Sequence, residues 1–216
     1  MPGQLRNTGG KLYLTIVNGT LAQKVDKTTP GAVLREYELP NKTKGSKWEL
    51  SYAYWEGLIT AIEFKEGDYG EQCYIHLPDA IIVLNTTTRY FADFAKKVFS
   101  GNLKESFKFH PFDIEGENGH IKGISLQQNG VKLKNYFYDF ETKKSLYDFP
   151  EPDETKKEKK TYWKIYFTEV TEFLIDKLKQ IKFDNVKDSE NPEGFNENAP
   201  VADDENYDYK NDLPFN

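Results

Sequence analysis

Lysines alternate with aromatic residues in three segments of this 216-residue chain, at positions 42–55, 104–109 and 132–138. Single-stranded nucleic acid presents unpaired bases and phosphates, and proteins hold it with aromatic rings that stack on bases and cations that follow the backbone. Each stack contributes about 1–3 kcal/mol and tolerates any sequence, because every base has a π face. The three segments therefore favour a surface that binds unpaired strands without reading their sequence.

Tyrosine and tryptophan are the better candidates for base contacts, because they keep a polar group and tolerate water better than phenylalanine. Phenylalanines are assigned mostly to the core. A half-buried strand with aromatic residues inward and lysines outward produces the same alternation, so for each strand alone that alternative stays open. The residues predicted to stack on bases are Trp48, Tyr52, Tyr54, Trp55, Tyr74, Tyr136 and Tyr138. The residues predicted to contact phosphates are Lys42, Lys44, Lys47, Lys108, Lys132 and Lys134.

Three alternating carboxylates offer a different chemistry. Asp113, Glu115 and Glu117 fall on one face of an expected strand, where they would hold a divalent metal for nuclease chemistry. A solvated strand edge before a glycine-containing turn explains the same stripe, and we favour that interpretation. The histidines lack metal-ligand spacing, Cys73 has no partner, and no phosphate loop or nucleophile elbow is present. The sequence therefore predicts no enzyme, catalytic residue, metal or cofactor.

Most of the elements that would carry these residues are β-strands. Thr86–Thr88 is expected to cap a short helix ending near Ser100, and apolar residues at spacings of three and four predict an amphipathic helix over 160–182. Asn18-Gly19 and Asn129-Gly130 are turn signals. The strands are expected at 11–17, 20–26, 32–39, 48–55, 57–65, 71–77, 80–84, 105–115, 120–128 and 131–140.

This order suits a mainly β chain with a short helix between strands and a closing C-terminal helix. A five-stranded Greek-key barrel of the OB-fold type fits it, as do other α+β arrangements. We expect one OB-fold-like domain over residues 1–184, followed by a disordered acidic tail over 185–216. The start of the chain has no apolar signal region, no stretch approaches a membrane span, and Cys73 is the single cysteine, so a reducing cytoplasm is expected.

The tail accounts for the acidic balance of the whole chain. Of the net charge of −6, residues 185–216 contribute 2 − 9 = −7, and the remaining 27 basic and 26 acidic residues give +1. An acidic run that ends in an apolar tip has no packing role of its own, so we expect a partner to grip it. The residues predicted to contact that partner are Asp203, Asp204, Glu205, Asp208, Asp212, Leu213, Pro214 and Phe215.

This tail resembles that of bacterial and phage single-stranded DNA-binding proteins, in which an acidic run ends in a short Pro-Phe tip. Here Asn216 follows Phe215, so the terminal carboxylate is not on the phenylalanine. The resemblance implies a phage-encoded protein of the host cytoplasm that coats single-stranded DNA and recruits replication or recombination proteins through the tip. Two alternatives stay open: a phage assembly or carbohydrate- or protein-binding β-module, and the metal-dependent nuclease.

Overall fold

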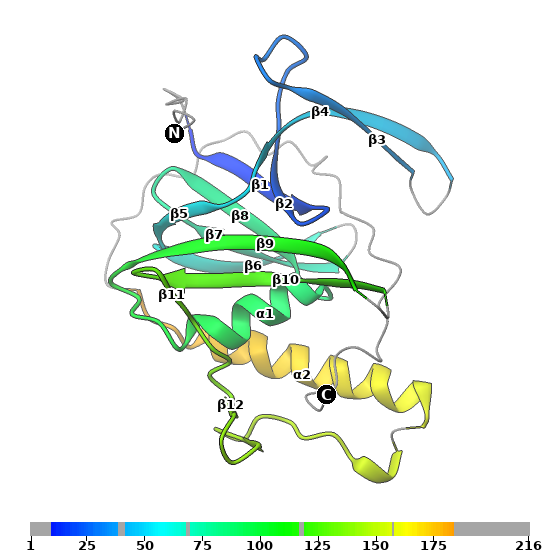
Figure 1. Ribbon diagram of the computed structural model, residues 1–216, viewed down its shortest axis with the longest axis vertical. Helices are drawn as coiled ribbons and strands as arrows, with labels where there is room; N and C mark the ends of the chain where they lie inside the picture. The colour runs from blue at the N-terminus through cyan, green and yellow to red at the C-terminus, as the bar shows by residue number, and fades with distance from the viewer. Residues whose placement is uncertain (1–9, 39–41, 68–69, 117–118, 157, 184–216) are drawn as a thin grey trace.

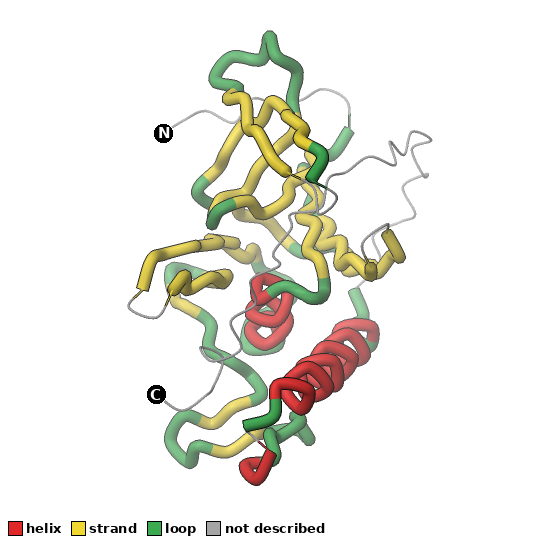
Figure 2. Tube along the Cα trace, turned by 90° about the vertical axis from the view of Figure 1, so that its right-hand side faces the viewer, coloured by secondary structure: helices red, strands yellow, loops and turns green. Residues whose placement is uncertain are grey.

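The computed structural model describes residues 10–38, 42–67, 70–116, 119–156 and 158–183. The predicted tail, 185–216, lies outside the described residues. Within these ranges, thirteen strands and two α-helices form a mainly β protein, with the two larger sheets above both helices and the β12–β13 hairpin at the bottom of the view (Figures 1 and 2). The fold class expected from the sequence is confirmed at this level.

The largest of three sheets has seven strands. All neighbours in it are antiparallel except β1 and β8, which run parallel. Its strands, in spatial order, are β3 (Val33–Glu38), β4 (Lys44–Tyr52), β2 (Thr20–Lys24), β1 (Leu12–Val17), β8 (Ala80–Asn85), β7 (Gly70–His76) and β6 (Ala61–Gly67).

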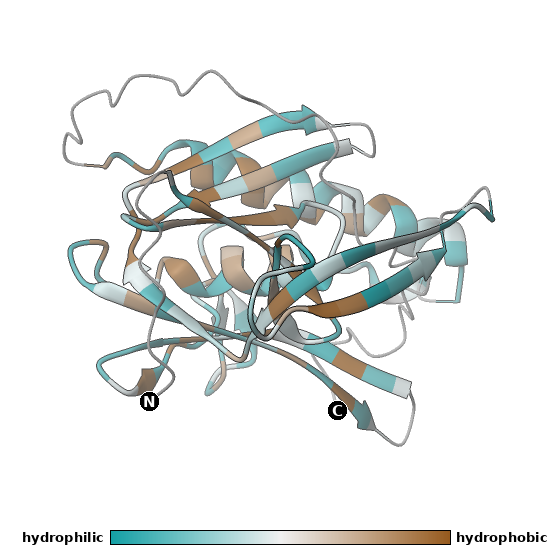
Figure 3. Cartoon of the chain, turned by 90° about the horizontal axis from the view of Figure 1, so that it is seen from above, coloured by the Kyte–Doolittle hydropathy of each residue, from teal (hydrophilic) through white to brown (hydrophobic). Residues whose placement is uncertain are grey.

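A four-stranded sheet and a short hairpin complete the β-structure. The four-stranded sheet has the order β11 (Val131–Lys132), β10 (Gly119–Gln128), β9 (Ser106–Gly116) and β5 (Trp55–Leu58). The hairpin pairs β12 (Tyr138–Asp139) with β13 (Lys144–Ser145). Coloured by hydropathy and seen from above, the strands show alternating hydrophobic and hydrophilic residues, as expected when one face is buried (Figure 3).

The sheets are not closed into a barrel, so the expected OB-type barrel is not what the strands form. The seven-stranded sheet ends at β3 and β6, and the four-stranded sheet ends at β11 and β5. The division arises at Ala53 and Tyr54, where the chain leaves β4 and pairs as β5 with β9. The single strand expected over 48–55 is therefore two strands in different sheets.

The short helix α1 (Arg89–Val98) fills the core beside both sheets. Thr88 caps it by accepting a hydrogen bond from the Phe91 amide, as the sequence indicated. Phe91 and Phe94 are fully buried, and their rings lie 6.2 Å from Phe64 of β6 and 6.0 Å from Phe109 of β9. Burying each such ring stabilises the fold by about 1.5–3 kcal/mol, so α1 holds the two sheets in a fixed relation.

The closing helix α2 (Lys160–Lys179) packs against α1 and β6. Val170, Leu174 and Leu178 form its buried stripe, which confirms the amphipathic helix expected over 160–182. A 3-10 turn, η1 (Glu154–Lys156), precedes it. Within the described part of the chain, neither helix is both long and apolar enough to cross a bilayer.

Two β elements lie toward opposite ends of the long axis. The two-stranded ribbon of β3 and β4 projects at one end, and β12 lies at the other (Figure 1). The described chain runs from β11, at the edge of the four-stranded sheet, directly into the β12–β13 hairpin.

Candidate nucleic-acid interface

A row of polar side chains crosses the outer face of the four-stranded sheet. Lys108 of β9 lies opposite Gln127 of β10, which in turn lies opposite Lys132 of β11. Directly opposed residues share a face, whereas the alternate residues Phe109 and Leu126 point inward and are fully buried. The sheet thus presents two of the predicted phosphate contacts, Lys108 and Lys132, on one surface.

Tyr54 adds an exposed ring next to this row. Its side chain is 51 % exposed, and the Lys108 ammonium lies 3.8 Å from the centre of its ring. A cation at this distance is attracted to the ring face and holds it in place. The break between β4 and β5 therefore puts a predicted stacking residue beside a predicted phosphate contact.

The β12–β13 hairpin continues the same mixture with a denser set of rings. Tyr138 lies opposite Ser145 in the ladder of the hairpin. The Tyr136 and Tyr147 rings are stacked, with centres 4.5 Å apart and planes 4° from parallel. Tyr138 and Phe140 pack edge to face at 5.0 Å. Tyr147 and Phe140 are 54 % and 59 % exposed, so bases can reach the rings from solvent.

The hairpin is fixed to the body by the residue between its two predicted tyrosines. Phe137 is 1 % exposed and lies 5.4 Å from Phe99 and 5.4 Å from Phe173 of α2. A backbone hydrogen bond from the Tyr136 amide to the Lys96 carbonyl of α1 adds to this anchor, and one from the Leu146 amide to the Phe137 carbonyl closes the hairpin.

Polar contacts set the details of the hairpin. A hydrogen bond with Tyr147 raises the pKa of the Tyr136 hydroxyl. The Thr142 hydroxyl donates to Asp139 and, with backbone amides, lowers the pKa of that carboxyl. Lys143 and Tyr147 have positive φ angles of 57° and 58°. Such conformations are costly for residues with a side chain.

We call these residues the lysine–aromatic strip. Six of them were predicted from the sequence: Tyr54, Lys108 and Lys132 lie on or beside the four-stranded sheet, and Lys134, Tyr136 and Tyr138 lie on the segment that follows β11. Phe140 and Tyr147 were missed, because phenylalanines were assigned to the core and Tyr147 lies in an irregular segment. The strip consists of Tyr54, Lys108, Lys132, Lys134, Tyr136, Tyr138, Phe140 and Tyr147.

Two predicted stacking residues lie in the interior instead. Trp55 is 6 % exposed, and its indole N–H donates to Asp79 at 3.3 Å. Tyr74 is 8 % exposed, and its hydroxyl donates to Gln72 at 2.9 Å. Burial leaves neither ring a face for a base, so both assignments are corrected to packing roles.

Trp48 and Tyr52 are half-buried on the core-side face of β4, away from the strip. The Tyr52 ring packs edge to face on Trp55 at 5.1 Å, and its hydroxyl donates to Gln23 at 2.8 Å. Tyr52 is therefore committed to packing between the sheets. Tyr54 lies beyond the end of β4 at Tyr52, in the break before β5.

The remaining predicted phosphate contacts belong to the β3–β4 ribbon. Lys47 is 7 % exposed and forms an ion pair with Glu49 at 2.8 Å, so its assignment as an open phosphate contact is corrected. Lys44 is exposed, and it lines an open pocket with Glu36 and Glu38. Lys42 is exposed just before β4, with a φ of 63°.

The carboxylate stripe is engaged by basic neighbours. Asp113 lies 2.7 Å from Nδ1 of His120 and 3.9 Å from the Lys122 ammonium. Glu115 is exposed, and Glu117 lies outside the described residues. Over the described ranges, no three histidine, cysteine or acidic side chains converge as metal ligands do.

Comparison with known proteins leaves the strip as the main basis for inferring a function. No protein-family model matches this chain, and neither the curated proteins nor the solved structures include a significant match.

Proposed function

We propose that this chain binds single-stranded DNA along the lysine–aromatic strip, without sequence specificity. The observation that carries the proposal is the exposed Tyr147 ring, stacked nearly parallel on the half-buried ring of Tyr136. A base placed on the outer ring extends an existing stack, and the anchor at Phe137 means that the rings need no reordering on binding. A closed barrel is not required, because stacking needs exposed rings beside cations.

Lysines along the strip supply the electrostatic part of binding. Lys108, Lys132 and Lys134 would each contact a phosphate as the strand passes from the four-stranded sheet to the hairpin. These contacts are few, and residues 1–184 carry a net charge of only +1. Stacking therefore supplies much of the affinity, and the dependence of affinity on salt is modest.

The acidic tail has a separate role in the proposal. Its tip, Leu213-Pro214-Phe215, recruits replication or recombination proteins, as the resemblance to single-stranded DNA-binding proteins implies. These residues lie outside the described part of the chain, so the support for this role is the sequence pattern alone. Deleting residues 203–216 should leave folding intact and keep or raise the affinity for DNA, whereas loss of DNA binding would contradict the assignment.

The direct test is a titration of fluorescently labelled oligo(dT) with the full chain, read by anisotropy, with a duplex of equal length as control. Anisotropy is preferred to tryptophan quenching because Trp55 is buried and Trp48 lies away from the strip. Saturable binding of oligo(dT), weakened when Tyr136 and Tyr147 are both changed to alanine, would support the proposal. Absence of binding, or equal affinity for the duplex, would overturn it.

A further inference from the structure

The outer face of the β3–β4 ribbon carries a second cluster of cations around a tyrosine. Strand register places Arg35 opposite Lys47, Tyr37 opposite Gly45, and Lys24 of β2 opposite Glu49. The Glu49 carboxylate accepts from Arg35 Nε at 2.7 Å and Nη2 at 3.3 Å, and it pairs with the Lys47 ammonium at 2.8 Å. One carboxylate therefore organises a face that three cations share.

The charges of this cluster do not cancel. Three cations, Lys24, Arg35 and Lys47, surround one acid, Glu49, which leaves 3 − 1 = +2. Glu49 is 5 % and Lys47 is 7 % exposed, and a buried ion pair of this kind adds little stability over apolar packing. Desolvation, with smaller contributions from Arg35 and Lys24, lowers the pKa of Lys47 despite Glu49. A further anion would offset the repulsion among the cations.

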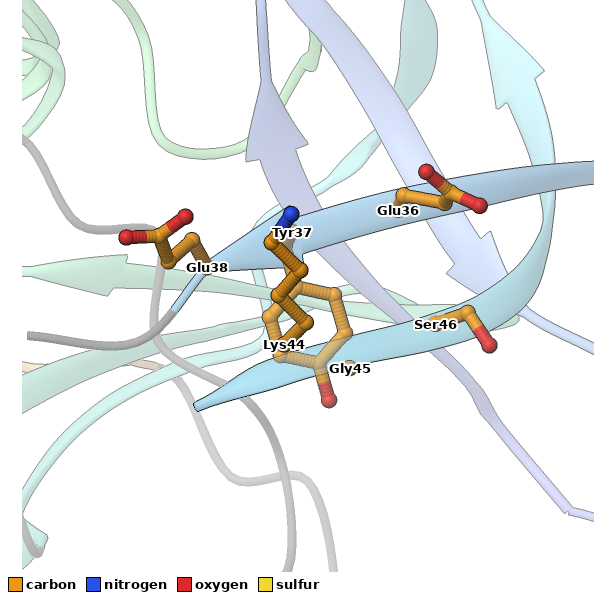
Figure 4. A pocket seen from close by; sticks show the side chains of 6 residues that line it. All are labelled: Glu36, Tyr37, Glu38, Lys44, Gly45 and Ser46. Atoms are coloured by element: carbon orange, nitrogen blue, oxygen red, sulfur yellow. The ribbon is translucent and has the colours of Figure 1, made fainter. Parts of the chain in front are cut away.

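Tyr37 lies against the ribbon in a position that depends on a glycine. The Arg35 guanidinium and the Lys47 ammonium lie 5.4 and 5.8 Å from the centre of its ring. A Cβ at Gly45 would come within 2.5 Å of that ring, so position 45 must be glycine for the ring to cross β4 there (Figure 4). Glycine here permits the close approach, and the cations on either strand hold the ring.

The other face of the ribbon has the opposite character. Glu36, Glu38, Lys44 and Ser46 alternate with the residues of the outer face and, together with Tyr37 and Gly45, line an open pocket of about 590 Å³ (Figure 4). Two carboxylates against one lysine make this face acidic. An anionic ligand would therefore approach the ribbon from the side of Arg35 and Lys24.

We propose that the outer face of the ribbon is a second binding site for single-stranded DNA, in which a base packs on Tyr37 while phosphates contact Arg35 and Lys24. The choice of ligand rests on the proposed function of the chain, but the residues are separate from the strip. The ribbon and the β12–β13 hairpin lie toward opposite ends of the long axis (Figure 1). Each chain therefore binds two short strands at once, or two parts of a long one.

The test is the stoichiometry of a short oligo(dT), roughly 5 nucleotides and near the smallest sites known for single-strand binding modules, on the full chain. We expect two oligonucleotides per chain. Tyr37→Ala and Gly45→Ala should each reduce this to one, because the first removes the ring and the second displaces its tip. Lys24→Ala should weaken the same site. Two oligonucleotides bound with unchanged affinity in all three variants would overturn the proposal.

Matched controls separate this site from folding and from the strip. Lys164→Ala removes an exposed cation from α2, and Gly67→Ala adds a methyl group where the nearest atom is 3.4 Å away, so both should keep two oligonucleotides. Thermal melting should show that every variant is folded. If alanine at Tyr136 and Tyr147 leaves binding unchanged while Tyr37→Ala abolishes it, the ribbon proposal is supported and the proposed function of the strip is overturned. If the reverse holds, the ribbon proposal is overturned and the strip stands.

Discussion

The rings of Tyr136 and Tyr147 lie parallel on the surface, 4.5 Å apart, although eleven positions separate them in the chain. Replacing Tyr147 by alanine should weaken oligo(dT) binding by roughly 5- to 150-fold, the equivalent of removing one stack. Tyr147→Phe keeps the ring and should retain most of the affinity. Anisotropy titrations of both variants check this, and equal affinities for them would count against stacking on this pair.

The strip lysines should set the salt dependence of binding. Lys132→Ala and Lys134→Ala should each make the slope of log affinity against log salt shallower, by about 0.7 for each phosphate that the protein no longer neutralises. Lys164→Ala, at an exposed position of α2, should leave the slope unchanged. Titrations over a series of salt concentrations measure all three, and a slope that does not change in the strip variants contradicts the phosphate role.

Phe137 should determine the stability of the fold, whereas Phe140 should contribute to DNA binding. Phe137→Ala leaves a cavity among rings of the core and should lower the free energy of unfolding by about 3–5 kcal/mol. Phe140→Ala, at an exposed position, should change it by no more than about 0.5 kcal/mol while weakening DNA binding. Urea denaturation and anisotropy separate the two effects. A stable Phe137→Ala variant would show that the hairpin is not anchored in the core.

The thiol of Cys73 should be unreactive in the folded chain. The side chain is fully buried, and burial, with a smaller contribution from Glu71, raises the pKa of the thiol well above its usual value. Because the thiolate is the reactive form, labelling by a disulfide reagent at neutral pH should proceed no faster than unfolding. Urea should make labelling fast and stoichiometric. Rapid labelling without denaturant would contradict this burial.

His76 should make stability depend on pH between about 7 and 5. Burial lowers the pKa of His76 below its ordinary value of 6.5, although Glu63, with Oε2 3.4 Å from Nε2, acts in the opposite direction. The distance permits attraction, but Nε2 makes no hydrogen bond with the described residues. The unfolded chain therefore takes up this proton at higher pH than the folded chain does.

The direction in which stability changes with pH follows from that difference in proton uptake. The stability contributed by neutral His76 is complete above about pH 6.5 and is lost as the pH falls toward the folded-state pKa. His76→Gln should flatten the change in free energy of unfolding between pH 7 and 5, whereas His110→Gln, at an exposed position, should not. Urea denaturation at several pH values measures this, and an unchanged profile in His76→Gln rules out the assignment.

Local patterns predicted most of the elements. Thr88 caps α1 as its position before an apolar run indicated, and α2 follows its stripe of residues at spacings of three and four. The Asn18-Gly19 and Asn129-Gly130 turns both have positive φ at each residue, which is the conformation that these pairs favour. Helix caps, amphipathic stripes and tight turns are set by residues close together in the chain, so a single sequence is enough to predict them.

Features set by contacts between distant segments were not predictable in the same way. Alternation of aromatic residues continues past Tyr52, so nothing local shows that the chain changes sheets before Trp55. The burial of Lys47 depends on Arg35 and Glu49 meeting through strand register. The strip was found in part because Lys108 and Lys132 lie in strands, whereas Tyr147 lies in an irregular segment.

Phe137 lies between two half-buried tyrosines, and its own ring lies among those of Phe99, Phe149 and Phe173. Tyr136 and Tyr138 therefore flank a core residue in the same backbone segment. Their backbone cannot move unless Phe137 leaves the core. Amide exchange at Tyr136 and Tyr138 should consequently be as slow as in the core strands. The loss of conformational freedom at these rings is incurred once, when the chain folds, and does not recur at each encounter with a ligand.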